Sequence, residues 1–140
     1  MKRHLLGTIL AFCSAANADN YLSFKAPSKA DAEAWLNAFT DAQDMTRDGI
    51  VLKSNLKREE LSELLKSLRT KAKTLFGDVI SPFGDCTKSV ESVNWYWQTQ
   101  LSLIADPTND TDSKALSLVT LAWEGGEYYA KCARMINALP

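Results

Sequence analysis

Residues 106–112 (DPTNDTD) form the most turn-like segment of the chain and decide how it folds. Proline fixes one backbone angle, and the short polar side chains of asparagine and aspartate bond to nearby backbone groups, so such a cluster favours a turn. Apolar residues recur at helical spacing on both sides of the segment. The pattern predicts two antiparallel helices joined by a tight turn centred near Asn109.

The helix before this turn is expected to open at Ser81-Pro82, because serine is a good N-cap and proline suits the first helical position. Gly84 is a reason for its regular part to begin only at Asp85. It should end at Asp106-Pro107. Its apolar stripe consists of Cys86, Val90, Val93, Trp97, Leu101 and Ile104. The helix after the turn should run from about Asp112 to near the C-terminus. Its stripe consists of Leu118, Ala122, Gly125, Tyr129, Cys132 and Ile136.

Two cysteines fit this hairpin as a disulfide pair. Residues of two antiparallel helices lie side by side when their numbers share a common sum, here about 218 because the turn is centred near Asn109. Cys86 and Cys132 satisfy that sum. In an oxidising compartment two cysteines of one small domain are expected to bridge. The bridge would tie the open end of the hairpin and stabilise the fold by about 4 kcal/mol through the loop it closes.

Two further helices are expected before the hairpin. The first has Ser28 as its N-cap and Gly49 as its stop, and the second begins between Ser54 and Arg58 and ends at Gly77. Ile50-Val51-Leu52 is interpreted as a short apolar link. The first stripe is Trp35, Ala38, Phe39, Ala42 and Met45, and the second is Leu61, Leu64, Leu65, Leu68, Ala72 and Leu75. With no clear strand alternation, the sequence predicts an all-α, four-helix bundle-like single domain over residues 19–140.

Residues 1–18 have the order of a secretory signal peptide. A basic start (Lys2, Arg3) precedes the short apolar run of residues 5–12 (LLGTILAF), and small residues follow at Ala16 and Ala18. The run is too short to serve as a membrane span, and no other apolar run approaches that length. We therefore expect an exported protein without a membrane span, in the bacterial periplasm or, alternatively, outside the cell.

Composition and charge exclude several functions. The chain has 140 residues, 46% of them hydrophobic, and a formal net charge of −1, so it lacks the basic surface that nucleic acid requires. Removal of the leader would leave 14 Lys and Arg against 17 Asp and Glu, and no histidine, because His4 is the only one. Histidine-based catalysis and histidine-ligated zinc are then impossible. We expect no cofactor and no enzymatic activity; an enzyme using only Asp, Glu or Tyr is the least favoured alternative.

Aromatic residues in the middle of the hairpin are the candidate binding residues. They are Trp95, Tyr96, Trp97, Trp123, Tyr128 and Tyr129, and they flank the pair Gly125-Gly126. Three consecutive aromatics on a helix point about 100° apart, so they cannot all face one core. Exposed Trp and Tyr are typical anchors of protein interfaces. The competing interpretation is that the other helices cover all six side chains.

A calcium site is a weaker alternative. Asp44, Thr46 and Asp48 match the first, third and fifth positions of an EF-hand loop, and Gly49 matches the sixth. Asn55 stands where the loop needs a bidentate glutamate, and Arg47 places a cation inside it. We therefore predict no metal site and interpret the stretch as a helix end.

These observations favour a non-enzymatic protein-binding module, such as an inhibitor or an immunity-type protein. In size, leader, disulfide and helix content the chain is similar to small periplasmic helical proteins that neutralise toxins or chaperone envelope clients. The alternative is a small-ligand carrier whose pocket is lined by the hairpin aromatics. The expected partner is another protein, and the sequence leaves the oligomeric state open.

Overall fold

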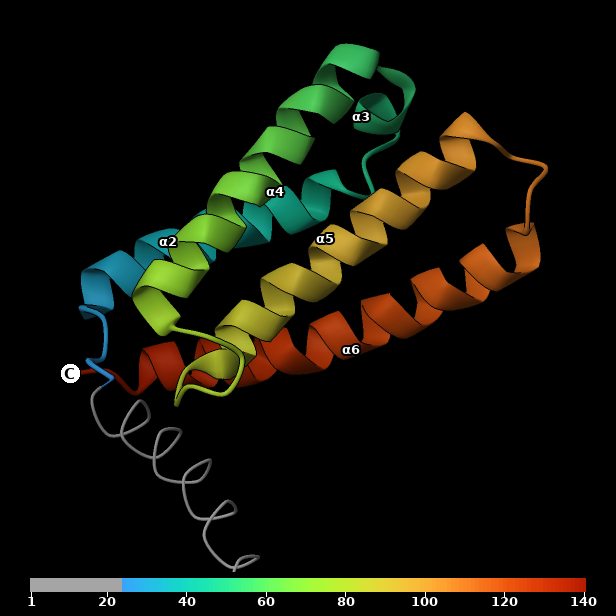
Figure 1. Cartoon of the computed structure of the whole chain (residues 1–140). Helices are drawn as coiled ribbons and strands as arrows, with labels where there is room; N and C mark the ends of the chain where they lie inside the picture. Colours follow the sequence, from blue (N-terminus) through green and yellow to red (C-terminus); the bar gives the residue numbers. More distant parts are fainter. Residues whose placement is uncertain (1–23) are drawn as a thin grey trace, which may run out of the picture.

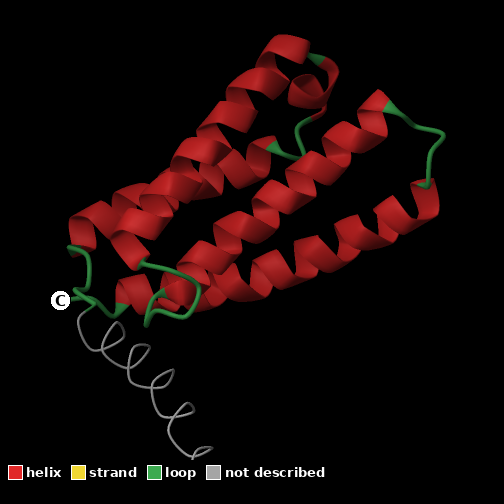
Figure 2. Cartoon of the chain, viewed as in Figure 1, coloured by secondary structure: helices red, strands yellow, loops and turns green. Residues whose placement is uncertain are grey.

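The computed structural model describes residues 24–140, so the predicted leader lies outside the described residues. This part of the chain is all-helical, with no strand (Figure 2). Its five helices are α2 (Lys29–Met45), α3 (Gly49–Lys53), α4 (Asn55–Phe76), α5 (Gly84–Ala105) and α6 (Thr111–Asn137). The predicted all-α, bundle-like fold is confirmed.

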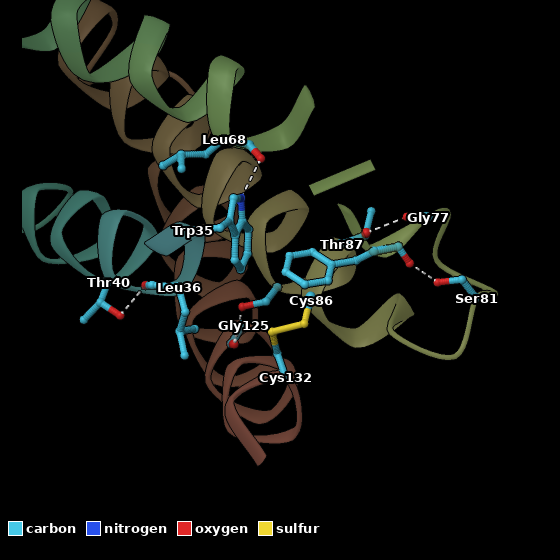
Figure 3. Close-up of a disulfide and its surroundings, with 12 residues drawn as sticks. Trp35, Leu36, Thr40, Leu68, Gly77, Ser81, Cys86, Thr87, Gly125 and Cys132 are labelled. Carbon is cyan, nitrogen blue, oxygen red and sulfur yellow. Dashed lines mark hydrogen bonds between the residues drawn. A yellow bond between two sulfur atoms is a disulfide. The ribbon is translucent and has the colours of Figure 1, made fainter. Parts of the chain in front are cut away.

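Helices α5 and α6 form the predicted antiparallel hairpin (Figure 1). Cys86 and Cys132 are joined by a disulfide, with their Cα atoms 4.7 Å apart, and both are fully buried (Figure 3). The register of the hairpin also agrees with the common sum of 218 at Val93 and Gly125, which lie farther from its open end. A Cβ built on Gly125 would lie 3.9 Å from Cγ2 of Val93. The hydroxyl of Ser89 donates to the carbonyl of Gly125 at 3.4 Å. Small residues thus let the two helices approach closely at the disulfide end.

Helices α2 and α4 cover the other side of the hairpin. Helix α4 packs on α5, and α2 packs on α4 and on α6. The buried Trp35 of α2 donates its indole N–H to the carbonyl of Leu68 in α4 at 3.0 Å (Figure 3). The largest fully buried apolar side chains of the core are Trp97, Phe39, Phe76, Leu61, Leu65, Ile136 and Val90. The core therefore lies between all four long helices and on the disulfide side of the hairpin.

Several helix ends differ from the prediction. The expected link at 50–52 belongs to the one-turn helix α3, because the carboxylate of Asp48 accepts the N–H of Ile50 and caps it. Helix α2 ends at Met45, before Gly49. Ser81 does not cap α5; its hydroxyl donates to the carbonyl of Phe76 and holds the loop after α4. The last helix starts at Thr111, one residue from the expected start, and its N-cap is Asp110.

Three residues assigned to the apolar stripes are exposed, and two more, Leu118 and Ala122, are only half-buried and lie outside the core. Ala38, Leu64 and Ile104 are exposed. Leu64 and Ala38 lie at the edges of stripes whose centres are buried, where the neighbouring helix no longer covers them. Ile104 is exposed for a different reason, because it lies where α2 and α4 no longer flank α5.

The turn end of the hairpin is a two-helix arm, comprising residues 101–124. No residue of this arm is buried. In Figure 1 the arm extends away from α2 and has the α5–α6 turn at its tip. The arm thus exposes apolar surface that a four-helix bundle of full length would cover.

Between residues 24 and 140, no helix combines the length and the apolar character that a membrane span requires.

Candidate protein-binding surface

The six hairpin aromatics occupy four different environments. Trp97 belongs to the core: it is fully buried, and its indole N–H donates to the hydroxyl of Ser62 in α4 at 2.8 Å. Tyr129 is half-buried against α2, where its hydroxyl lies 2.8 Å from that of Thr40 and its ring packs near Phe39. These two aromatics hold the hairpin to α4 and α2. Trp97 is thus covered by the rest of the chain, and Tyr129 is partly covered.

Tyr96 and Tyr128 are half-buried beneath cations. The guanidinium of Arg47 lies 5.9 Å from the ring centre of Tyr96. The ammonium groups of Lys88 and Lys131 lie 5.4 and 5.8 Å from the ring centre of Tyr128, one from each helix of the hairpin. Such contacts are electrostatic attractions between a cation and the negative face of a ring. Both tyrosines already have partners within the chain.

Trp95 and Trp123 are the two aromatics left in solvent, with 62% and 69% of their surfaces exposed. Each lies two residues from an interface position of its own helix, Val93 in α5 and Gly125 in α6. Two residues turn a helix by about 200°, so both indoles point away from the opposite helix. None of the six aromatics stacks on another among the described ring pairs. The structure therefore does not bring them together as one pocket.

Trp123 has apolar neighbours that the sequence analysis did not single out. Leu116 and Val119 precede it on α6, and 69% and 67% of their surfaces are exposed. Gly126 and Ala130 continue the same line and are also exposed. The spacing of three, four, three and four residues is that of a coiled-coil seam. We call these five residues the outer seam; plotting both faces of α6, and not only the face with Cys132, would have found it.

The outer seam is exposed because it lies on the face of α6 that is turned away from the rest of the molecule. On the opposite face of α6, Gly125, Cys132 and Ile136 are buried against the rest of the molecule. Helix α6 follows one outer edge of the molecule, and no other labelled helix lies beyond it (Figure 1). Contiguous exposed apolar side chains of this size on a small protein are typical of interaction sites.

Charges of opposite sign flank the outer seam. Its N-terminal side carries Asp112 in the first turn of α6, with Asp110 just before the helix. Its C-terminal side carries Lys131 and, in the last turn, Arg134. All four residues are exposed. The surface therefore has an acidic end, an apolar middle and a basic end.

Gly126 has no structural explanation within residues 24–140. A Cβ built there would meet no atom within 4 Å, whereas one on Gly125 would lie 3.4 Å from Cβ of Ser92. A glycine inside a helix costs about 1 kcal/mol relative to alanine. At Gly125 the close approach of α5 gives a reason for that cost, and at Gly126 nothing in the described chain does.

The residues of the calcium alternative take part in helix ends. The hydroxyl of Thr46 donates to the carbonyl of Gln43, and the carboxylate of Asp48 caps α3. Within residues 24–140, no group of three His, Cys, Asp or Glu side chains is arranged to hold a metal ion. Asp44 lies exposed in the last turn of α2.

Two surface grooves lie away from the hairpin aromatics. A groove of about 320 Å³ runs between α2 and α4, with Trp35, Ala38, Leu68 and Leu75 among its lining residues. A more polar groove of about 450 Å³ lies between the start of α4 and Leu101 of α5. Neither groove is lined by any of the six aromatics expected to form a ligand pocket.

Comparison of the chain with protein-family models, with curated proteins and with solved structures found no match, so its function has to be inferred from its own surface.

Proposed function

We propose that this protein is a small exported, non-enzymatic protein-binding module, of the inhibitor or immunity type, that binds its partner through the outer seam of α6. The observation that carries the proposal is the exposure of Leu116, Val119 and Trp123 in one line on a disulfide-tied scaffold. Burying such side chains in a protein interface stabilises the complex by removing apolar surface from water. Tryptophan in particular dominates the energetics of many interfaces.

The helical scaffold supports this use of the surface. Side chains on a regular helix keep fixed relative positions, so a partner meets a preorganised surface and loses little entropy in ordering it. The ligand-carrier alternative has less support, because the expected aromatic residues are divided between the core, the cation contacts and the solvent. Export is part of the proposal, and the buried disulfide favours it because such bonds persist in oxidising compartments.

Site-specific photo-crosslinking in the host cell tests the proposal. A photo-reactive amino acid replaces Trp123 in one variant and Leu56 in a control variant. Leu56 is a matched control because it is 65% exposed and apolar but lies on α4. We expect a protein adduct from position 123 and none from position 56.

Absence of any adduct from position 123, or the same adducts from both positions, would overturn the proposal. Native mass spectrometry of the protein purified from its host covers the carrier alternative. A bound small molecule without any protein adduct would favour a carrier.

A further inference from the structure

The outer seam has a large half and a small half. Its N-terminal half consists of Leu116, Val119 and Trp123, and its C-terminal half consists of Gly126 and Ala130. The two halves follow one another on a single helix. A partner helix fits this surface where it places a smaller side chain opposite each larger one.

A second copy of the same helix, running antiparallel, meets that requirement. Antiparallel coiled coils place residues in layers whose numbers share a common sum, and a sum of 242 puts the twofold axis near Leu121. The layers are then Val119 with Trp123, Leu116 with Gly126, and Asp112 with Ala130. Each layer joins a larger side chain with a smaller one, and each occurs twice because the interface is symmetric.

The charges agree with the same arrangement. An antiparallel pair brings the acidic start of one α6, with Asp110 and Asp112, to the basic end of the other, with Lys131 and Arg134. A parallel pair would bring Asp112 to Asp112 and Arg134 to Arg134, and like charges across an interface repel. On the flank of the seam, Glu127 would face the uncharged Thr120 of the second copy. The antiparallel pair therefore has no like-charge contact at these positions.

The same pairing explains Gly126. In one copy nothing lies within 4 Å of a Cβ built at this position, so the missing side chain leaves a shallow gap on an exposed helix. In the antiparallel pair that gap lies opposite Leu116, which shares with Trp123 the highest exposed fraction among the exposed large hydrophobic residues. A glycine at a helix–helix contact lets the backbones approach and gives a bulky neighbour room.

We propose that the outer seam binds the outer seam of a second copy, so that the protein is a twofold homodimer held by antiparallel α6 helices. This inference rests on one part of the proposed function, that the seam is a protein-binding surface, and it names a second copy of the chain, rather than an inhibited protein, as the partner. In this register the two α6 helices face each other over residues 111–131, which is about 30 Å of helix.

Analytical ultracentrifugation of the exported, disulfide-bonded protein tests the dimer. We expect twice the chain mass for the natural protein at micromolar concentration. Leu116→Asp should weaken self-association at least a hundredfold (about 2.7 kcal/mol), because it places a carboxylate in the apolar seam. Leu56→Asp is the control: the residue type is the same and the exposure is similar, 65% against 69%, but it lies on α4 and should leave the mass at twice that of one chain.

Charge reversal tests the antiparallel orientation. Asp112→Arg and Arg134→Asp should each weaken the dimer, because each places like charges opposite one another. The double variant should restore self-association, because the acidic and basic ends are then exchanged and attract again. In a parallel pair the double variant would not rescue the singles.

Each result decides the question. The homodimer would be overturned by a single-chain mass for the natural protein, or by loss of the dimer only with Leu56→Asp. The antiparallel orientation would be overturned if the double variant self-associates no more strongly than the two single variants. The proposed function fails separately. If the protein is a monomer but position 123 still forms an adduct with a different protein, the proposed binding function stands with another partner. If position 123 forms no adduct of any mass, both the binding function and the homodimer are overturned.

Discussion

Gly125 and Gly126 are neighbours in the sequence with opposite surroundings. A side chain added at Gly125 would point toward Ser92 at the α5–α6 contact, and one added at Gly126 would point into open space. In the sequence the pair lies among the six hairpin aromatics. In the structure a Cβ built on Gly125 meets Ser92 and Val93 of α5, and a Cβ built on either glycine meets no aromatic ring within 4 Å.

The two glycines should therefore respond differently to alanine. Gly126→Ala should raise the free energy of unfolding by about 0.5–1 kcal/mol, because the helix gains propensity and the methyl group meets nothing. Gly125→Ala should gain less, since its methyl group would lie 3.4 Å from Cβ of Ser92. Denaturant unfolding in the Leu116→Asp background measures this effect apart from self-association. Equal gains at the two positions would contradict the structural difference.

The environment of Trp97 was predictable from the sequence, and the environments of Trp95 and Tyr96 were not. Helical spacing correctly placed Trp97 in an apolar stripe and showed that its neighbours could not all share its environment. It could not assign Trp95 to solvent or Tyr96 to Arg47, because that depends on which sides of the hairpin α2 and α4 cover. The outer seam was missed for the same reason: Leu116 and Val119 look like core residues until the neighbouring helices stop short of them.

At the scale of elements, helix type and order were predictable and helix ends were less so. The apolar stripes fixed four long helices and the register of the hairpin, because burial repeats with the helical period. The ends depend on local competition between capping groups. Ser81, for example, bonds to the end of α4 instead of starting α5, and Asp48 starts a short helix where only a link was expected.

The α5–α6 turn contains a titratable contact. The hydroxyl of Thr108 donates to the carboxylate of Asp106 at 3.0 Å, and the Thr108 backbone N–H does so at 3.3 Å. The side-chain hydrogen bond, followed by the backbone one, holds the pKa of Asp106 below its ordinary value. Because the folded pKa is lowered, the contact stabilises the turn above the unfolded pKa, and this contribution is lost as the pH falls through the folded pKa.

Replacing Thr108 separates the two donors. Thr108→Val should raise the pKa of Asp106 toward its ordinary value, because it removes the hydroxyl and keeps the backbone donor. Thr108→Ser should leave the pKa lowered, because the hydroxyl is retained. Titration of the Asp106 carboxyl followed by NMR measures both values. The same pKa in the valine and serine variants would show that the hydroxyl contributes nothing.

At the scale of the whole molecule, the hairpin is fastened at one end and free at the other. The disulfide and the buried core lie at the end near Cys86 and Cys132, and the arm at the opposite end has no buried residue. Local stability follows the density of buried contacts. The molecule thus holds the large half of its outer seam, Leu116, Val119 and Trp123, on the least protected part of its fold.

Loss of the disulfide should destabilise the protein substantially. The closed loop spans 46 residues, and its chain-entropy contribution is about 4 kcal/mol, a large share of the 5–15 kcal/mol typical of a small domain. Cys86→Ala with Cys132→Ala should lower the free energy of unfolding by about that amount, measured with guanidinium. Adding reductant should destabilise the natural protein and leave the double variant unchanged. Two titratable thiols in the denatured, unreduced protein would contradict the bond.

Cys86 and Cys132 are the two cysteines of residues 24–140, so this part of the chain has one possible intramolecular pairing. Forming that bond needs an oxidant but no isomerase, because these residues offer no wrong pairing to undo.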